Sequence, residues 1–263
     1  IKLARKYGQL NGGSKRKTIV TLESSFHGRT LATLTATGQD KFHPDCFAPY
    51  PEGFKTIKAN DFEALETAFD DTTCALFIEC IQGEGGVKLI DSQWAKAAAE
   101  AARKAGAIVM ADEVQTGIGR TGTFLASDAL GFNPEVVTLA KGIAAGVPMG
   151  ACLFRGKAAD IFVAGDHQST FAGNPLACAA GNVVVKTVAN QKFLNEVTQK
   201  GEYIKDTIKS WNIPFVKDIR GKGLMIGIQI EENIKPLDVE IKCLQEGLCV
   251  ATAGSDVVRF LPP

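Results

Sequence analysis

Residues 108–122 read "IVMADEVQTGIGRTG", an apolar run that ends in two acids and is followed by three spaced glycines. A short apolar run bounded by turn-forming residues predicts a buried β-strand. The polar part has three interpretations. Asp112 could close the strand of an ATP-binding site, or Gly117, Gly119 and Gly122 could form the G-x-G-x-x-G signature of a dinucleotide site. In the third interpretation Asp112 serves another cofactor and the glycines only shape a loop.

The sequence on both sides of this stretch alternates between strand-like and helix-like patterns. Apolar residues recur at helical spacing from Trp94 to Ala105, and Gly106 is placed to end that helix. Continuous apolar strands alternating with helices are typical of an α/β fold, a mostly parallel sheet with helices on both faces. We expect strands at Thr18–Leu22, Ala75–Ile78, Ala107–Ala111 and Val136–Ala140, a helix over Ile1–Tyr7 stopped by Gly8, and a helix opened by the capping box Asn60-x-x-Glu63.

The pattern changes in the last third of the chain. Residues 174–210 are predicted to be helical, with a looser patch around residues 190–191. Beyond them we expect an antiparallel-looking strand at Leu224–Ile230, a helix near Val239–Glu246 and a strand at Val257–Phe260. We therefore predict a large domain over residues 1–190 and the start of a smaller α+β C-terminal domain over residues 191–263.

The composition argues against some classes of partner. The 263 residues carry 29 basic and 29 acidic side chains, so the chain offers no net charge to a nucleic acid or an acidic membrane. No stretch approaches the roughly 20 apolar residues of a membrane span. The seven cysteines are scattered without a C-x-x-C pair, which favours a reducing, cytosolic setting and predicts no metal site. The chain begins without Met and both ends look cut, so we expect a piece of a longer protein.

The first two interpretations of residues 108–122 lack their sequence context. An ATP site needs G-x-x-x-x-G-K-[ST] upstream, and the nearest stretch, Gly8–Lys15, has Ser14 where the lysine belongs. This interpretation is disfavoured but stays open. A dinucleotide site needs its first glycine directly after the strand and a helix after the third. Gly117 lies five residues beyond Asp112, and the residues after Gly122 are too few for that helix.

The third interpretation gains support from Lys141, which follows the next apolar strand. Residues at the carboxyl ends of neighbouring parallel strands meet in one crevice. A carboxylate and an amine in one place are what pyridoxal phosphate requires: the lysine forms an imine with the cofactor aldehyde, and the aspartate keeps the ring nitrogen protonated. The alternative is an ordinary Asp112–Lys141 ion pair, which the spacing alone favours.

Five stretches, taken together and in order, decide between these alternatives: "SFHGRT", "IECIQGEGG", "DEVQTGIGRTG", "LAKGIAAGVPMGA" and "HQSTFAGNPLACAAG". They resemble the class III aminotransferases, pyridoxal-phosphate enzymes of fold type I. The resemblance implies transamination between an ω-amino donor and 2-oxoglutarate in a homodimer with shared sites. The stretches "GDHQSTFAGNP" and "ATAGSDVVRFLPP" favour N-acetylornithine, a step of arginine biosynthesis, over ornithine, succinyl-diaminopimelate or 4-aminobutyrate. An inactive truncated copy is the other alternative.

The resemblance also assigns cofactor-binding residues. It makes Lys141 the imine-forming lysine and Asp112 the partner of the ring nitrogen, with Gln115 on the phenolic oxygen. Val114 and Phe26 are expected on the two faces of the ring. His27 is expected beside the cofactor in a positioning role, Glu79 behind it, and Thr170 on the cofactor phosphate of the neighbouring subunit.

The resemblance places four residues at the substrate. Arg29 holds the carboxylate far from the reacting carbon in both half-reactions. Arg259 binds the second carboxylate of glutamate, and Glu84 covers Arg259 when the substrate carries an ω-amine instead. Ser169 is expected near the substrate. An arginine suits both carboxylate sites because its planar fork donates two parallel hydrogen bonds.

Overall fold

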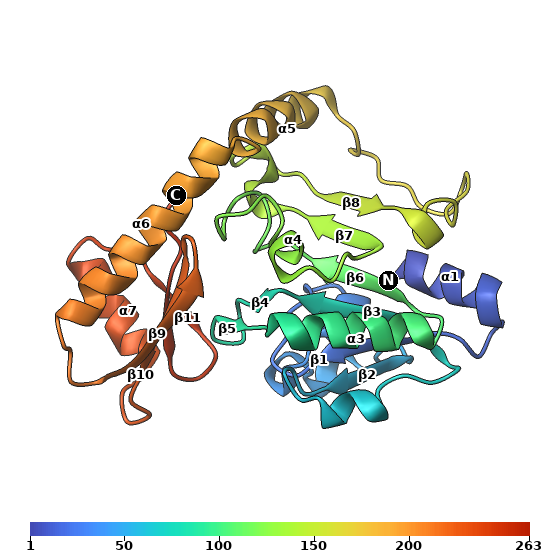
Figure 1. The fold of residues 1–263 in the computed structure, drawn as a ribbon, viewed down its shortest axis with the longest axis horizontal. Coiled ribbons are helices and arrows are strands. Elements are labelled where there is room, and N and C mark those ends of the chain that lie inside the picture. Colours follow the sequence, from blue (N-terminus) through green and yellow to red (C-terminus); the bar gives the residue numbers. More distant parts are fainter.

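The computed structural model describes residues 1–263 throughout and contains two main sheets connected by long helices (Figure 1). The first sheet has six strands in the order β2-β1-β3-β6-β7-β8, all parallel except β8, which runs antiparallel to β7. This confirms the predicted mostly parallel sheet. Its strands are β1 (Thr18–Leu22), β2 (Phe54–Ile57), β3 (Thr73–Glu79), β6 (Ile108–Asp112), β7 (Val136–Leu139) and β8 (Ala151–Phe154).

The helices and short turns fill the connections between the strands. The helices are α1 (Lys2–Gly12), α2 (Leu31–Ala36), α3 (Ser92–Lys104), α4 (Ala126–Leu130), α5 (Pro175–Val188), α6 (Gln191–Ser210) and α7 (Pro236–Gln245). Single 3₁₀ turns lie at Asp40–Phe42, Asp45–Phe47, Glu63–Glu66, Lys141–Ala144 and Gly156–Ala158. None of the helices combines the length and apolar character needed to cross a bilayer.

Helices cover both faces of the first sheet, as the alternating pattern predicts. Side chains along a strand point alternately to opposite faces. On β3, Leu76 and Ile78 share one core cluster with Trp94 of α3. The intervening Phe77 belongs to a second cluster, which contains Tyr7 of α1.

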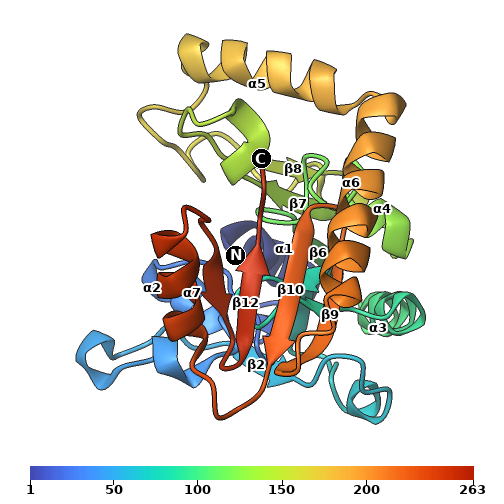
Figure 2. The same ribbon diagram turned by 90° about the vertical axis from the view of Figure 1, so that its left-hand side faces the viewer.

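The second sheet is antiparallel, with the order β11-β12-β10-β9, and α6 packs against it (Figures 1 and 2). Ile208 of α6 is buried with Ile219, Ile226 and Ile228 of the sheet. The expected strands in this region are present, and two further strands accompany them. The sheet consists of β9 (Val216–Lys222), β10 (Met225–Ile230), β11 (Ala251–Ala253) and β12 (Val257–Phe260); a separate hairpin is formed by β4 (Ile81–Gln82) and β5 (Lys88–Leu89).

The looser patch predicted around residues 190–191 is the break between α5 and α6. Asn190 caps α6, because its side-chain oxygen accepts the backbone N–H of Lys192 at 2.9 Å. The proposed domain boundary between residues 190 and 191 coincides with this break and stays a proposal.

Two local predictions were wrong. Gly8 does not stop α1, because the helix continues to Gly12. Gly8 lies where the helix touches the backbone of Arg16, and a Cβ at this position would be 1.9 Å from the Arg16 carbonyl oxygen. The capping box at Asn60 opens no α-helix. The Asn60 side chain bonds the backbone of Leu89 and Asp91 instead, and only a 3₁₀ turn follows.

Candidate active site

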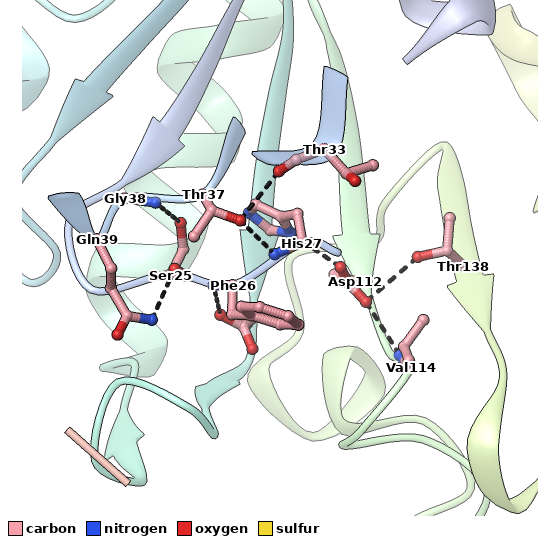
Figure 3. Close-up of polar contacts among 11 residues, drawn as sticks. Ser25, Phe26, His27, Thr33, Thr37, Gly38, Gln39, Asp112, Val114 and Thr138 are labelled. Atoms are coloured by element: carbon pink, nitrogen blue, oxygen red, sulfur yellow. Dashed lines mark hydrogen bonds and ion pairs between the residues drawn. The ribbon is translucent and has the colours of Figure 1, made fainter. Parts of the chain in front are cut away.

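The candidate site lies at the carboxyl ends of β3, β6 and β7, with Asp112 at its centre. Asp112 ends β6 and pairs in register with Glu79 on β3 and Thr138 on β7. Its carboxylate is buried. Oδ1 accepts the Val114 N–H at 3.1 Å and the Thr138 hydroxyl at 3.4 Å, and Oδ2 lies 2.9 Å from Nδ1 of His27 (Figure 3). Three segments, which carry His27, Val114 and Thr138, therefore fix the position of one carboxylate.

His27 supports this carboxylate from behind. The imidazole is fully buried and stacks on Phe77, with 4.0 Å between ring centroids. Because a carboxylate only accepts, Nδ1 carries the proton and donates it to Asp112. Nε2 is buried without a hydrogen-bond partner. The positioning role expected for His27 matches this geometry.

Glu79 is a second buried carboxyl group beside Asp112. Its Oε2 accepts the Phe26 N–H at 2.8 Å. Burial, and to a smaller extent the negative charge of Asp112, raises the pKa of Glu79 well above its ordinary value. The pair therefore holds one negative charge more readily than two.

Lys141 begins the 3₁₀ turn that follows β7 and adopts a left-handed backbone with a φ of 47°. Loss of solvation lowers the pKa of its ammonium group, and the charge of Arg259 adds to this effect against the opposing charges of Glu84, Glu79 and Asp112. Lys141 forms no ion pair with Asp112, which bonds His27 instead. The ordinary ion pair considered from the sequence is therefore not formed, although both residues lie at the same edge of the sheet.

Arg259 reaches this edge from β12 of the second sheet. Its Nη1 donates to Oε1 of Glu84 at 2.8 Å and to Oε1 of Gln115 at 3.1 Å. Nε2 of Gln115 lies 3.4 Å from the same Glu84 oxygen. The Arg259 side chain is only 8% exposed, and its Nε has no partner. The structure thus brings together the predicted pair of Glu84 and Arg259 and adds Gln115 to it.

Phe26 and Arg29 lie on one loop after β1. The Phe26 ring meets Phe42 edge to face at 5.4 Å. The guanidinium of Arg29 lies over the rings of Phe42 and Phe26, at 4.5 and 5.5 Å from their centroids. Arg29 is exposed and forms no ion pair within the chain, so its fork is free to bind an external carboxylate.

Two predicted residues do not contact this group. Ser169 and Thr170 are exposed in the long loop between β8 and α5, the yellow segment of Figure 1, and neither bonds a predicted site residue. The assignment of Thr170 depends on a second subunit, and that of Ser169 stays a prediction.

Glu113 was missed by the sequence reasoning. It is buried and accepts the Thr116 hydroxyl at 2.6 Å and the Ser127 N–H at 2.7 Å, which fastens the glycine-rich loop to the first turn of α4. The sequence feature that could have indicated its role is a second acid directly after the apolar run, upstream of the short helix α4. Glu113 places the loop that carries Val114 and Gln115.

Comparisons with known proteins give one consistent result. Residues 1–263 match the family described as aminotransferase class-III. An acetylornithine aminotransferase from Caldanaerobacter subterraneus is 44% identical over 265 residues, covering 100% of this chain and 67% of that protein. This chain thus spans about two thirds of the length of that relative.

The solved structures agree with this match. An ornithine aminotransferase from Toxoplasma gondii has a TM-score of 0.93 at 32% identity, covering 100% of this chain and 64% of the other. An N-acetylornithine aminotransferase from Stenotrophomonas maltophilia has a TM-score of 0.82 at 30% identity, covering 99% and 64%. The fold is that of the fold type I aminotransferases.

Proposed function

Because this chain belongs to the class-III aminotransferase family, whose members depend on pyridoxal phosphate, we propose that it transfers the ω-amino group of N-acetylornithine to 2-oxoglutarate. One observation carries the proposal. A buried carboxylate, an amine of lowered pKa and a guanidinium covered by a glutamate meet at one edge of the sheet. These three groups suit a cofactor that accepts electrons and a substrate whose second carboxylate is present in only one half-reaction.

The residues at the edge of the sheet fit pyridoxal phosphate. When bound, the cofactor supplies an aldehyde that reacts with amines and a ring that accepts electrons from the substrate carbon. Asp112 is buried and oriented by His27, and its two oxygens keep lone pairs for the ring nitrogen. We assign the aldehyde to Lys141, the ring nitrogen to Asp112, the phenolic oxygen to Gln115, and the two ring faces to Phe26 and Val114.

The protonation states suit proton transfer at the substrate carbon. The lowered pKa of Lys141 increases the fraction of free amine at neutral pH, so Lys141 can accept a proton as well as return it. The raised pKa of Glu79 keeps a second negative charge away from Asp112. Asp112 is then the single anion available to the ring nitrogen.

The pair of Glu84 and Arg259 accounts for two substrates in one site. With Glu84 on Arg259, the guanidinium is neutralised and an ω-amine is tolerated near it. With Glu84 displaced, Arg259 can bind the second carboxylate of glutamate. Arg29, whose guanidinium is unpaired, holds the other carboxylate in both half-reactions.

A homodimer explains the two predicted residues that lie apart from the site. Ser169 and Thr170 are exposed, and large apolar side chains around them are exposed too, including Phe171 at 81% and Leu176 at 71%. Patches of this kind mark interaction surfaces. We assign Thr170 to the cofactor phosphate of a neighbouring subunit.

A screen of amino donors tests the proposal. The full-length, cofactor-loaded protein is mixed with N-acetylornithine, ornithine, succinyl-diaminopimelate or 4-aminobutyrate, and conversion of the cofactor is followed by absorbance. N-acetylornithine should react fastest. Ornithine is the main competitor, because the ornithine aminotransferase structure superposes closely. A faster reaction with ornithine would replace the proposed substrate, and no reaction with any donor would favour an inactive copy.

A further inference from the structure

We infer that Gln115 is the fixed hydrogen-bond acceptor that keeps Arg259 in place while Glu84 moves. The inference rests on the proposed function, since it concerns the exchange of carboxylates on Arg259. It gives Gln115 a positioning role toward the substrate in addition to its assigned contact with the cofactor.

Arg259 has two acceptors on the same nitrogen, and they differ in mobility. Nη1 carries two hydrogens and donates one to Glu84 at 2.8 Å and the other to Gln115 at 3.1 Å. The Glu84 side chain is 29% exposed, and only its Oε1 is hydrogen-bonded. Glu84 can therefore leave toward solvent by giving up only its bond from Arg259 and its long, 3.4 Å bond from the Gln115 amide.

Packing against Gly83 and an anchored loop restrain Gln115. Its amide oxygen lies directly on the buried backbone of Gly83, where a Cβ would be only 1.9 Å from it. The loop that carries it is tied to the backbone and to the side chain of Glu113: the Gly117 N–H donates to the Glu113 carbonyl at 2.9 Å, and the Thr116 hydroxyl donates to the Glu113 carboxylate at 2.6 Å. When Glu84 leaves, Gln115 still accepts from Arg259.

This second acceptor matters because Arg259 is a nearly buried cation. A buried charge without partners is costly, and a free guanidinium would rotate or withdraw. Nε is already without a partner, so loss of Glu84 would leave Gln115 as the one hydrogen-bond partner of the guanidinium within the chain. Gln115 therefore presents Arg259 in a defined orientation to the arriving carboxylate.

The test measures binding of unreactive acids to the cofactor-loaded protein by calorimetry. Glutarate has two carboxylates and needs both Arg29 and Arg259, whereas valerate has one and needs only Arg29. The Gln115→Met variant keeps the size of the side chain but removes the acceptor. It should weaken the binding of glutarate about tenfold, which is the scale of one hydrogen bond to a charged group. The affinity for valerate should change by no more than about twofold.

Two further variants separate the positioning role from other roles. Gly83→Ala, which displaces the Gln115 amide without removing it, should also weaken glutarate selectively and provides the test if Gln115→Met does not fold. The loss from Gln115→Met should persist in a Glu84→Ala background, because Gln115 acts on Arg259 directly. Gln93→Met, at an exposed position of α3, is the control and should change neither affinity.

The possible outcomes separate this inference from the proposed function. Equal losses for glutarate and valerate would show that Gln115 acts through the cofactor or the general shape of the site, and no loss would show that it is not needed as an acceptor; either result overturns the inference. A wild-type protein that binds glutarate no tighter than valerate would overturn the proposed function itself.

Discussion

Glu79 and Asp112 end neighbouring strands in register, yet their side chains have different environments. Asp112 receives hydrogen bonds on both oxygens, whereas Glu79 is buried beside that anion and has a raised pKa. The difference predicts which carboxyl group keeps a proton, and this has a measurable effect on stability.

Replacing Glu79 with Gln should change how stability depends on pH. The folded-state pKa of Glu79 lies above the ordinary value of 4.5, so the folded protein holds more protons than the unfolded one between these two values. The free energy of unfolding of the wild type therefore falls as the pH rises through that window. Glu79→Gln keeps an acceptor for the Phe26 N–H and lacks this fall, so its stability relative to wild type should increase from about pH 4.5 upward. Urea unfolding from pH 4.5 to 8 measures the difference. A difference independent of pH would show that folding does not raise the pKa of Glu79.

Glu84 and Arg29 should affect the two half-reactions differently. Glu84→Gln uncovers Arg259, so the half-reaction with glutamate should be kept or improved while that with N-acetylornithine weakens. Arg29→Lys removes the bidentate contact that we propose for both substrates. The loss should cost about 1.5–3 kcal/mol, so both half-reactions should slow roughly ten- to a hundredfold. Single-turnover rates followed by cofactor absorbance measure both effects. Equal damage to both half-reactions by Glu84→Gln would contradict the moving-glutamate model.

At the scale of elements, close backbone contacts decide where the chain tolerates a side chain. At an exposed helix position, alanine is normally more favourable than glycine by about 1 kcal/mol. Gly8→Ala in α1 should nevertheless destabilise the protein by about 1–3 kcal/mol, because its Cβ would meet the Arg16 carbonyl oxygen and Cys74. Gly12→Ala in the same helix is the control, since its Cβ would touch only the flexible side chain of Arg16. Chemical unfolding of the two variants checks this, and equal stabilities would show that α1 can shift away from Arg16.

The elements that could be predicted from the sequence are those whose signal is local. The apolar runs gave β3 and β6, and the alanine-rich periodicity gave α3. The two wrong predictions concern residues whose roles depend on other segments of the chain. Gly8 is required by its close contact with Arg16, and Asn60 bonds residues 89–91 instead of capping a helix.

The same distinction holds for the site. Asp112 and Lys141 could be brought together by strand order alone. Arg259 lies 175 residues beyond Glu84, and only the family resemblance could pair them. Glu113 was missed because burial, which makes it an anchor for α4, is not visible in an acid that simply follows a strand.

At the scale of the whole molecule, the site is assembled where the two sheets meet. Arg220 of β9 donates to the Gly86 carbonyl at 2.7 Å, in the loop that carries Glu84. The backbone of Gly223 lies against Arg120 and Thr121 of the glycine-rich loop, so closely that a Cβ would be 2.7 Å from the Arg120 carbonyl oxygen. The position of Arg259 relative to Lys141 is therefore set by the packing of one sheet on the other.

A subunit-mixing experiment tests whether the sites are shared between chains. Lys141→Ala and Thr170→Ala should each give protein with little activity. If Thr170 acts in the neighbouring subunit, a mixed dimer contains one site with both substitutions and one with neither, so mixing the two variants under conditions of subunit exchange should restore activity. Unmixed variants treated identically are the control. No recovery, with mixed dimers confirmed by mass, would place Thr170 in its own subunit's site or outside both.

The central claim is that Lys141 holds pyridoxal phosphate at the carboxyl edge of the first sheet. Borohydride reduction of the cofactor-loaded protein, followed by peptide mapping with mass spectrometry, tests it most directly. We predict a single pyridoxyl group on the peptide that contains Lys141, and none on the Lys141→Ala protein. A pyridoxyl group on a different lysine of the wild type, or its persistence in Lys141→Ala, would contradict the account.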